Sequence, residues 1–159
     1  YWRLVERAEE RDYSLFFLGA QPGVADRAAA KLRELYPRLR IVGVHDGYFD
    51  MTPGSPENEA LIRQVNNAAP DIITVGMSMP RQERWLYDNW DRLNAHIGLT
   101  GGAIFDYVSG EVKRAPRWMT DNGLEWFGRL AIEPGRLWRR YIVGNPVFLA
   151  RVLKQRLFP

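Results

Sequence analysis

The sequence predicts an α/β fold in which a parallel sheet is flanked by helices and is followed by a basic helical appendage. Three observations support this class. Short apolar segments alternate with amphipathic segments of about a dozen residues up to position 109, which is the pattern of a doubly wound sheet. Glycine-containing turns follow the apolar segments. From Gly110 onward the alternation stops, so we divide the chain into residues 1–109 and residues 110–159.

The spacing of apolar residues places each element of the first part. A short apolar run that stops at a glycine or a polar residue predicts a buried strand, whereas apolar residues three or four positions apart predict a helix. Tyr36-Pro37 marks a helix end, because the residue before a proline disfavours the helical conformation. In chain order we expect a helix over 1–11, a strand over 14–18, a helix over 24–35, a strand over 40–44, a helix over 56–69, a strand over 71–75, a helix over 81–90 and a strand over 96–100.

The same periodicity predicts which side chains of the first three helices face the core. Residues three, four or seven positions apart share one face of a helix. The expected inward residues are Leu4, Val5 and Ala8 in the first helix, Ala28, Ala29, Leu32 and Leu35 in the second, and Leu61, Ile62 and Val65 in the third.

The composition excludes several kinds of protein. With 159 residues, 46% hydrophobic and 26% charged, the chain is long enough and apolar enough for a folded domain. It has no cysteine, which excludes disulfides and thiolate metal sites. No apolar run reaches the roughly 18–20 residues that cross a bilayer. Carboxylates and histidines lack metal-ligand spacing, so we expect no metal. The chain begins with Tyr1, and we expect it to be a fragment or a processed product.

Charge is divided unevenly along the chain. Residues 1–110 carry 12 Lys and Arg against 15 Asp and Glu, whereas residues 111–159 carry 10 against 4, a net charge of +6. Aromatic residues accompany the basic ones in this second stretch. A segment of this kind predicts an anionic partner, which is a phospholipid surface, a nucleic acid or a phosphorylated substrate.

The predicted loops beyond the strand carboxyl ends are the expected ligand site, since open parallel sheets bind ligands there. These loops are residues 19–23, 45–56, 76–80 and 100–106. In the first, glycine lets the backbone approach a phosphate at a helix N-terminus, and a tight strand-to-helix turn explains the same residues equally well. The expected substrate-binding residues are Gly19, Gly23, Tyr48, Gly76, Ser78, Arg81, Gln82, Glu83, Gly101, Gly102, Phe105 and Asp106.

Two of these loops suggest specific contacts. Pro80 suits the first position of a helix, so Gln82 and Glu83 are expected to project from its first turn into the cleft while Arg81 pairs with phosphate. The alternative is that Glu83 merely favours the helix dipole. Asp106 is expected to accept hydrogen bonds from a ribose or base, with Phe105 packed nearby, and a structural helix cap is the alternative.

Asn145-Pro146 predicts the start of a helix with an N-cap followed by proline. Large apolar residues sweep one broad face of that helix, and basic residues occupy the other. Such a helix can lie in an anionic membrane interface, or pack on the domain or on another subunit. The apolar set is Phe148, Leu149, Val152, Leu153 and Leu157, and the polar set includes Arg151, Lys154 and Gln155.

At these residues the chain resembles the WecG/TagA/CpsF family of bacterial glycosyltransferases. Two positions differ from the family pattern: Ser78 replaces a usual glycine and Arg81 replaces a common lysine. The resemblance runs from Tyr1 to about Phe148 and rests on Phe17-Leu18-Gly19, Pro22-Gly23, Tyr36-Pro37, Gly47-Tyr48-Phe49, Pro70-Asp71, Val75-Gly76, Pro80-Arg81-Gln82-Glu83, Gly101-Gly102, Phe105-Asp106, Gly110, Lys113-Arg114-Ala115-Pro116, Leu124-Glu125-Trp126, Arg129-Leu130, Glu133-Pro134-Arg136 and Arg139-Arg140.

The resemblance implies an inverting, metal-independent transferase without a cofactor. Its members move a sugar, usually N-acetylmannosamine, from a UDP-sugar to an undecaprenyl-diphosphate-linked sugar in cell-surface polysaccharide synthesis. It also implies a Rossmann-like domain with a C-terminal appendage that contacts the inner face of the bacterial membrane from the cytoplasm. Family members usually carry a further N-terminal segment with the proposed general base, to which nothing here corresponds. Asp46, Asp50 and Asp106 therefore do not inherit that role.

Basic residues of the appendage are the expected catalytic groups of this hypothesis. They would hold the diphosphates of donor and acceptor, since arginine binds phosphate oxygens bidentately. We also expect a homo-oligomer. The candidates are Arg114, Arg129, Arg136, Arg139 and Arg140.

Two rival functions remain open from the sequence. The basic aromatic tail also suits a nucleic-acid-binding module, but it carries an apolar helical stripe and no RNA-binding motif, so we expect no nucleic acid as partner. The other rival is a non-catalytic scaffold that kept the fold of the enzyme.

Overall fold

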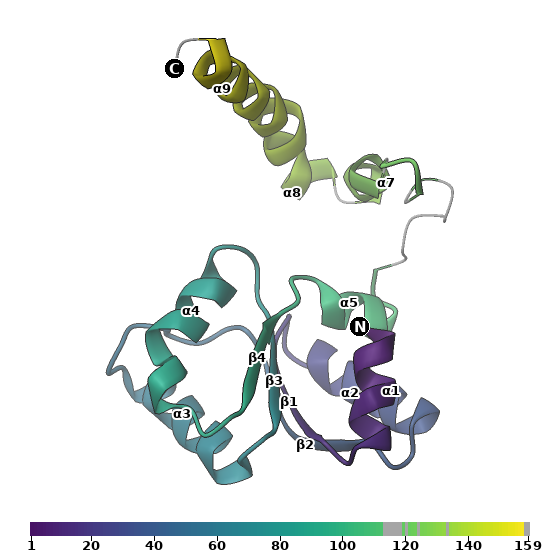
Figure 1. The fold of residues 1–159 in the computed structure, drawn as a ribbon, viewed down its shortest axis with the longest axis vertical. Coiled ribbons are helices and arrows are strands. Elements are labelled where there is room, and N and C mark those ends of the chain that lie inside the picture. The colour runs from purple at the N-terminus through teal and green to yellow at the C-terminus, as the bar shows by residue number, and fades with distance from the viewer. Residues whose placement is uncertain (113–118, 120, 124, 133, 158–159) are drawn as a thin grey trace. The chain divides into compact units, whose positions relative to one another are not determined.

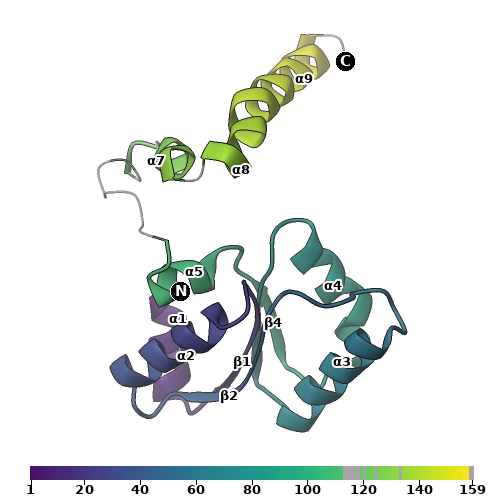
Figure 2. The same cartoon turned by 180° about the vertical axis from the view of Figure 1, so that it is seen from behind.

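The computed structural model describes residues 1–112, 119, 121–123, 125–132 and 134–157. By its internal contacts the chain divides into two compact units, Tyr1–Lys113 and Arg114–Pro159. Figures 1 and 2 show that the first unit contains the whole sheet, whereas the second is helical where it is described. The fold is therefore α/β, as predicted.

Four parallel strands form the sheet of the first unit, in the order β2-β1-β3-β4. The two central strands are buried along their whole length, because their sequences are continuous apolar runs with helices on both sides. The strands are β1 (Ser14–Gly19), β2 (Arg40–His45), β3 (Ile72–Gly76) and β4 (Ile97–Thr100).

Helices cover both faces of this sheet (Figures 1 and 2). Successive strand residues alternate between the faces, so Leu15 and Phe17 of β1 enter one core cluster while Phe16 and Leu18 enter the other. The first face is covered by α1 (Trp2–Glu10), α2 (Val24–Leu35) and α5 (Ile104–Ser109), and the second by α3 (Pro56–Ala68) and α4 (Arg81–Asn89), which continues into the short 3-10 helix η1 (Trp90–Arg92).

The structure confirms most predicted inward positions and corrects three details. Leu35 is 57% exposed, because it is the last residue of α2 and lies beyond the core that buries Leu32. His96 precedes β4 instead of belonging to it. Helix α5 was expected to be part of a loop, since six residues are too few to show a helical period.

A buried polar network joins α3 to α4. The indole N–H of Trp85 donates to Oδ1 of Asn58 at 2.7 Å, and the Asn58 amide donates to Oδ1 of Asn89 at 3.1 Å. The Asn89 amide then donates to the backbone carbonyl of Trp85 at 2.8 Å. All three side chains are buried. Because each buried donor has a partner, the network fixes the position of α4 without leaving a polar group unsatisfied.

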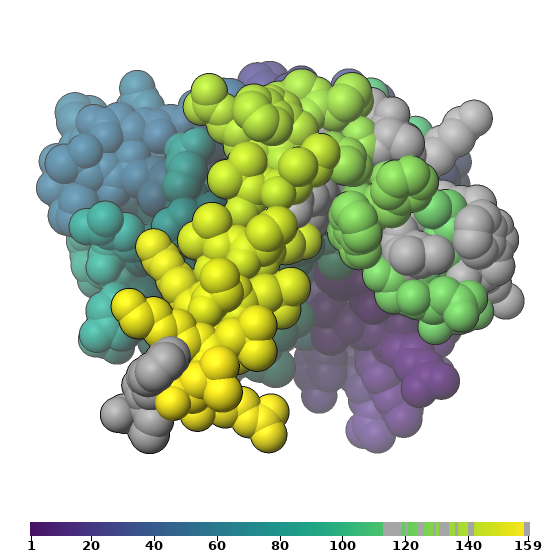
Figure 3. All heavy atoms as spheres, turned by 90° about the horizontal axis from the view of Figure 1, so that it is seen from above, coloured from purple at the N-terminus to yellow at the C-terminus, as the bar shows by residue number. Residues whose placement is uncertain are grey.

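The second unit is a series of helical segments that end in a long exposed helix. In Figure 3 the side chains of α9 (yellow) stand out from the helix on the side seen. Every residue from Asn145 to Leu157 is exposed, both apolar and basic. The segments are α7 (Glu125–Ile132), α8 (Pro134–Trp138), the π-helix η2 (Arg139–Gly144) and α9 (Asn145–Leu157).

The predicted N-cap at Asn145 is wrong. Its φ of −64° and ψ of −47° are helical, and η2 leads directly into α9. An N-cap residue has a non-helical backbone, so the helical turn continues through Asn145 instead of starting there. The α-helical segment α9 itself begins at Asn145, as expected, and Pro146 lies in its first turn, where the missing N–H of proline is tolerated.

Asp71 ties the amino end of the sheet together. Its Oδ2 accepts hydrogen bonds from the backbone N–H and the hydroxyl of Ser14, both at 2.7 Å, and its Oδ1 lies 3.6 Å from Nδ1 of His96. The backbone hydrogen bond from Ser14, followed by the hydroxyl bond, lowers the pKa of Asp71 below its usual value. The ionised carboxylate therefore stabilises the pairing of β1 with β3.

We expect Asp71→Asn to lower the free energy of unfolding at pH 7 by about 1 kcal/mol. This is less than the roughly 1.5–3 kcal/mol of a hydrogen bond to a charged group, because the side chain is partly exposed. A depressed folded-state pKa gives stability that is present above the unfolded pKa of about 3.9 and is lost as pH falls through the folded value. The difference between variant and wild type should therefore shrink below about pH 4. Urea unfolding at a series of pH values measures it, with Asp12→Asn as the control, since the exposed Asp12–Arg40 pair makes no such buried contact. A difference that stays constant with pH would contradict the assignment.

Candidate active site

The loops at the carboxyl ends of the four strands are joined by backbone hydrogen bonds into one continuous rim. The N–H of Ala20 donates to the carbonyl of Gly76 at 2.9 Å, and the N–H of Gly47 donates to the carbonyl of Ala20 at 2.9 Å. The N–H of Gly101 donates to the carbonyl of Val75 at 2.8 Å. We call residues 19–23, 45–49, 76–83 and 100–106 the loop rim; its backbone is positioned by the sheet before any ligand arrives.

Gly19 is required by the packing of the two central strands. Its φ is +137°, and a Cβ there would overlap the carbonyl group of Gly76. A Cβ at Gly76 would in turn lie 2.7 Å from the ring of Phe105. These contacts support the tight-turn interpretation of Gly19. A side chain on Gly76 would likewise push apart neighbouring parts of the protein.

Gly102 has a different environment. Its φ is +56°, and a Cβ there would meet no atom within 4 Å. The open space lies next to its backbone, and its N–H donates to Oε1 of Gln82 at 3.0 Å. Gly102 is therefore the glycine of the rim beside which a ligand has room.

Gln82 joins the third and fourth loops. It was expected to project into the cleft, but its side chain is buried between the first turn of α4 and the loop at Gly102. Its amide also donates to Oε1 of Glu83 at 2.6 Å. Gln82 thus fixes the Gly102 backbone and orients the exposed Glu83 carboxylate.

Arg81 joins the second and third loops. One of its Nη atoms donates to the carbonyl of Gly47 at 3.3 Å and lies 3.4 Å from the sulfur of Met51. Its own N–H donates to the carbonyl of the exposed Ser78 at 2.9 Å. Arg81 thus holds the loop that carries Tyr48, which is 64% exposed. The expected pairing of the exposed Arg81 with phosphate stays a prediction.

Arg27 is a cation that the sequence analysis missed. Gly23 is the N-cap of α2, and a Cβ on it would lie 3.0 Å from Nη1 of Arg27. The other Nη atom of Arg27 donates to Oε1 of Glu111 at 2.6 Å. The available signal was its position, four residues after Gly23, where a helical side chain reaches back over the preceding turn.

Phe105 belongs to the core, which corrects its expected place beside a ligand. It is 1% exposed, and its ring centroid lies 5.0 Å from that of Phe17. Asp106, the next residue, is partly buried in the first turn of α5. Its backbone carbonyl accepts from the N–H of Val112 at 3.1 Å, so this turn anchors the end of the first unit.

The five arginines of the appendage remain predictions. Arg114 lies outside the described residues, and for Arg129, Arg136 and Arg140 the described part is the backbone, in α7, α8 and η2. Arg139 is exposed, with its guanidinium 5.5 Å from the ring centroid of Trp138. This cation–π contact orients the side chain.

Two features are absent from the part of the chain that the structure describes. Within it, no three His, Cys, Asp or Glu side chains are grouped so that they could hold a metal ion. Nor does that part of the chain contain a helix long and apolar enough to cross a membrane.

Comparison with known proteins identifies the family. All residues from 1 to 159 match the family described as glycosyl transferase WecG/TagA/CpsF. The chain belongs to this family. It is also 32% identical over 148 residues to the N-acetylglucosaminyldiphosphoundecaprenol N-acetyl-beta-D-mannosaminyltransferase of Bacillus subtilis (strain 168), an alignment that covers 93% of this chain and 55% of that protein. The chain therefore spans about half the length of this curated relative.

We expect Gln82→Met to destabilise the first unit by about 1–2 kcal/mol, because the Gly102 N–H loses its acceptor in a partly buried position. Amide hydrogen exchange at Gly102 should accelerate in the same variant, and both effects are measurable by NMR and urea unfolding. Arg84→Met is the matched control on the same helix, since the exposed Arg84 makes only a long ion pair with Asp88, at 3.6 Å. Unchanged exchange at Gly102 in Gln82→Met would show that this hydrogen bond does not hold the loop.

Proposed function

We propose that this chain belongs to an enzyme that transfers N-acetylmannosamine from a UDP-sugar to an undecaprenyl-diphosphate-linked sugar. The observation that carries the proposal is the alignment with the Bacillus subtilis transferase, whose name states this sugar and this lipid-linked class of acceptor. The reaction would serve the synthesis of a bacterial cell-surface polysaccharide. Family membership supports glycosyl transfer as the reaction type.

The loop rim is the proposed binding site of the UDP-sugar. It lies at the carboxyl ends of parallel strands, where α/β folds bind nucleotides. Gly102 leaves open space beside the backbone, and the N-terminus of α2 presents backbone N–H groups near the turn at Gly23. Arg27, which is paired with Glu111, lies beside this turn. The diphosphate is the part of the donor that these groups would attract.

The proposed chemistry is a single displacement with inversion. The acceptor hydroxyl oxygen forms a bond to the anomeric carbon while the bond from that carbon to the UDP oxygen breaks. A general base takes the hydroxyl proton, and the leaving diphosphate gains negative charge. Arginines suit that charge without a metal or a cofactor, because their guanidinium groups bind phosphate oxygens bidentately and need no reorganisation. In the proposal these are Arg114, Arg129, Arg136, Arg139 and Arg140.

The appendage is the proposed membrane contact, on the cytoplasmic face of the bacterial membrane. Its helix α9 exposes large apolar side chains beside basic ones, as in Phe148, Leu153 and Lys154. Apolar burial and attraction to anionic lipid would act together on such a helix. Without a membrane the same apolar surface favours association of copies, so we propose a homo-oligomer in solution.

Radiolabelled transfer from UDP-N-acetylmannosamine to the lipid-linked acceptor is the direct test, performed on the intact protein. We expect transfer that is insensitive to EDTA. Arg139→Ala should lower kcat by about 10- to 100-fold, the equivalent of one charge-assisted hydrogen bond to the leaving group. Arg151→Ala removes the same charge from α9 and serves as the control, with little expected change in kcat. Failure to transfer from any UDP-sugar would refute the enzyme assignment, and salt-sensitive RNA binding without UDP binding would support the nucleic-acid alternative.

Sedimentation with vesicles tests the membrane contact. We expect the chain to bind vesicles that contain anionic lipid, and to bind less at high salt, because counter-charges screen the attraction. Phe148→Glu should weaken binding by about tenfold or more, since burying one large apolar side chain contributes roughly 1.5–3 kcal/mol. Tyr87→Glu, at an aromatic residue of the first unit that is even more exposed, 86% against 64% for Phe148, is the control. Binding that survives both high salt and Phe148→Glu would show that α9 is not the anchor.

A further inference from the structure

Glu83 presents a carboxylate at the loop rim with one oxygen held and the other open. Its Oε1 accepts the side-chain N–H of Gln82 at 2.6 Å. Among the residues that the structure describes, nothing bonds to its second oxygen, and Glu83 is exposed. An ionised carboxylate only accepts hydrogen bonds, so the open oxygen is available to a ligand group that donates one.

Gln82 holds this carboxylate beside the open backbone at Gly102. The carboxamide oxygen of Gln82 accepts the Gly102 N–H at 3.0 Å, while its nitrogen donates to Glu83. Gln82 is only 4% exposed, so packing keeps the shared side chain in place. A Cβ at Gly102 would meet no atom within 4 Å. A ligand that enters this space therefore has a fixed hydrogen-bond acceptor close by.

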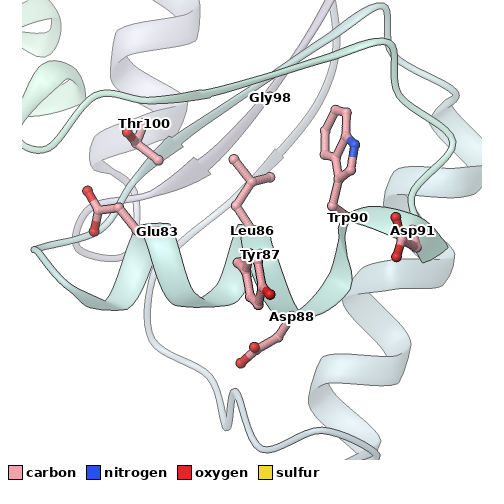
Figure 4. A pocket seen from close by; sticks show the side chains of 8 residues that line it. All are labelled: Glu83, Leu86, Tyr87, Asp88, Trp90, Asp91, Gly98 and Thr100. Carbon is pink, nitrogen blue, oxygen red and sulfur yellow. The ribbon is translucent and has the colours of Figure 1, made fainter.

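Thr100 places a hydroxyl at the same end of a cavity as Glu83. The cavity has a volume of about 730 Å³ and lies between α4 and β4, and Glu83 and Thr100 are the lining residues that also belong to the loop rim. Figure 4 shows their side chains together at one end, away from Trp90 and Asp91. Thr100 is exposed at the end of β4. Because a hydroxyl both donates and accepts, the pair can contact neighbouring polar groups of one ligand.

The charge of Glu83 determines which part of a UDP-sugar suits this place. A carboxylate repels the diphosphate, since like charges brought together in a binding site weaken binding. A hexose carries several hydroxyl groups and no charge, and N-acetylmannosamine adds an amide N–H. These groups all donate hydrogen bonds, and a donor forms a stronger bond to an ionised acceptor than to a neutral one. The sugar is therefore the part of the donor that fits beside Glu83.

We propose that Glu83 binds the sugar of the donor through hydroxyl or amide N–H groups, with Thr100 beside it, and so determines which sugars the site accepts. A site that bonds to a substrate hydroxyl discriminates strongly against an analogue that lacks it. This role rests on the proposed function, because it requires a UDP-sugar in the loop rim.

The same role gives the donor a direction across the sheet. Asp106 lies in α5, which covers the first face of the sheet, and Glu83 lies in α4, which covers the second. A nucleoside at Asp106 and a sugar at Glu83 would thus lie toward opposite faces. The diphosphate between them would cross the carboxyl ends of the central strands, where the turn at Gly23 lies.

Calorimetric titration of the 159-residue chain with UDP and with UDP-N-acetylmannosamine tests this role without sugar transfer. Glu83→Ala removes the acceptor and should raise the Kd of the UDP-sugar by about tenfold or more. Glu83→Gln keeps an oxygen that can accept from Gln82 but removes the charge, and should raise that Kd by about threefold. Neither variant should raise the Kd of UDP by more than about twofold, because UDP lacks the sugar and is repelled by the carboxylate.

Asp88→Asn is the matched control, since it removes one carboxylate from the same helix and the same cavity but lies outside the loop rim. It should change both Kd values by less than about twofold. Amide hydrogen exchange at Gly102 in Glu83→Gln should match wild type, because the bond from Gly102 to Gln82 does not involve Glu83.

The outcomes separate this role from its alternatives. A Kd of the UDP-sugar that is unchanged in Glu83→Ala would overturn the proposal and leave Glu83 as a residue that only favours the dipole of α4. An equal rise in the Kd of UDP would also overturn it, since the carboxylate would then act on the nucleotide. So would an effect of Asp88→Asn as large as that of Glu83→Gln. A wild-type chain that binds neither compound would refute the proposed nucleotide site itself, and this role with it.

Discussion

The parallel contact between β1 and β3 is the constraint on which the rest of the structure depends. Both strands are buried along their whole length, and they end at Gly19 and Gly76, whose backbones approach too closely for a side chain. This contact brings the loops after both strands to one point. The loop after β2 is bonded to the loop after β1, since the Gly47 N–H donates to the Ala20 carbonyl. The loop after β4 is bonded to β3 itself, since the Gly101 N–H donates to the Val75 carbonyl. The central pair of strands therefore determines the shape of the whole loop rim.

Helix α4 holds the fourth loop of the rim in place. Its inner side is fixed to α3 by the network of Trp85, Asn58 and Asn89, which leaves none of its buried side chains without a partner. Its first turn carries Gln82, which accepts from Gly102. Because the helix cannot slide without breaking the network, the Gly102 backbone keeps its position. A residue such as Gln82 therefore acts on the site from within the protein, although the sequence places it beside a turn that suggests direct contact with a ligand.

The sequence was sufficient for the sheet and for most helices, because a buried strand must be apolar along its length and a helix on a sheet must be apolar on one side. The sequence was insufficient where the burial or the contacts of a side chain depend on how the elements pack together. Leu35 has the correct spacing for burial, but the end of α2 extends beyond the core and leaves Leu35 exposed. Phe105 follows a glycine pair that suggests a ligand, yet it fills the core against Phe17. Arg27 carries no motif, and its place near Gly23 depends on how α2 leaves the turn.

The two halves of the proposed chemistry place opposite demands on the structure. Holding a nucleotide needs a rigid backbone, which the buried parallel strands provide at their carboxyl ends. Holding a lipid-linked acceptor needs apolar surface that is open to a membrane, and α9 exposes such surface in a charged setting. One compact core cannot meet both demands, since residues buried well enough to fix the loops cannot also face lipid. In the proposed enzyme the sheet meets the first demand, and a separate basic appendage meets the second.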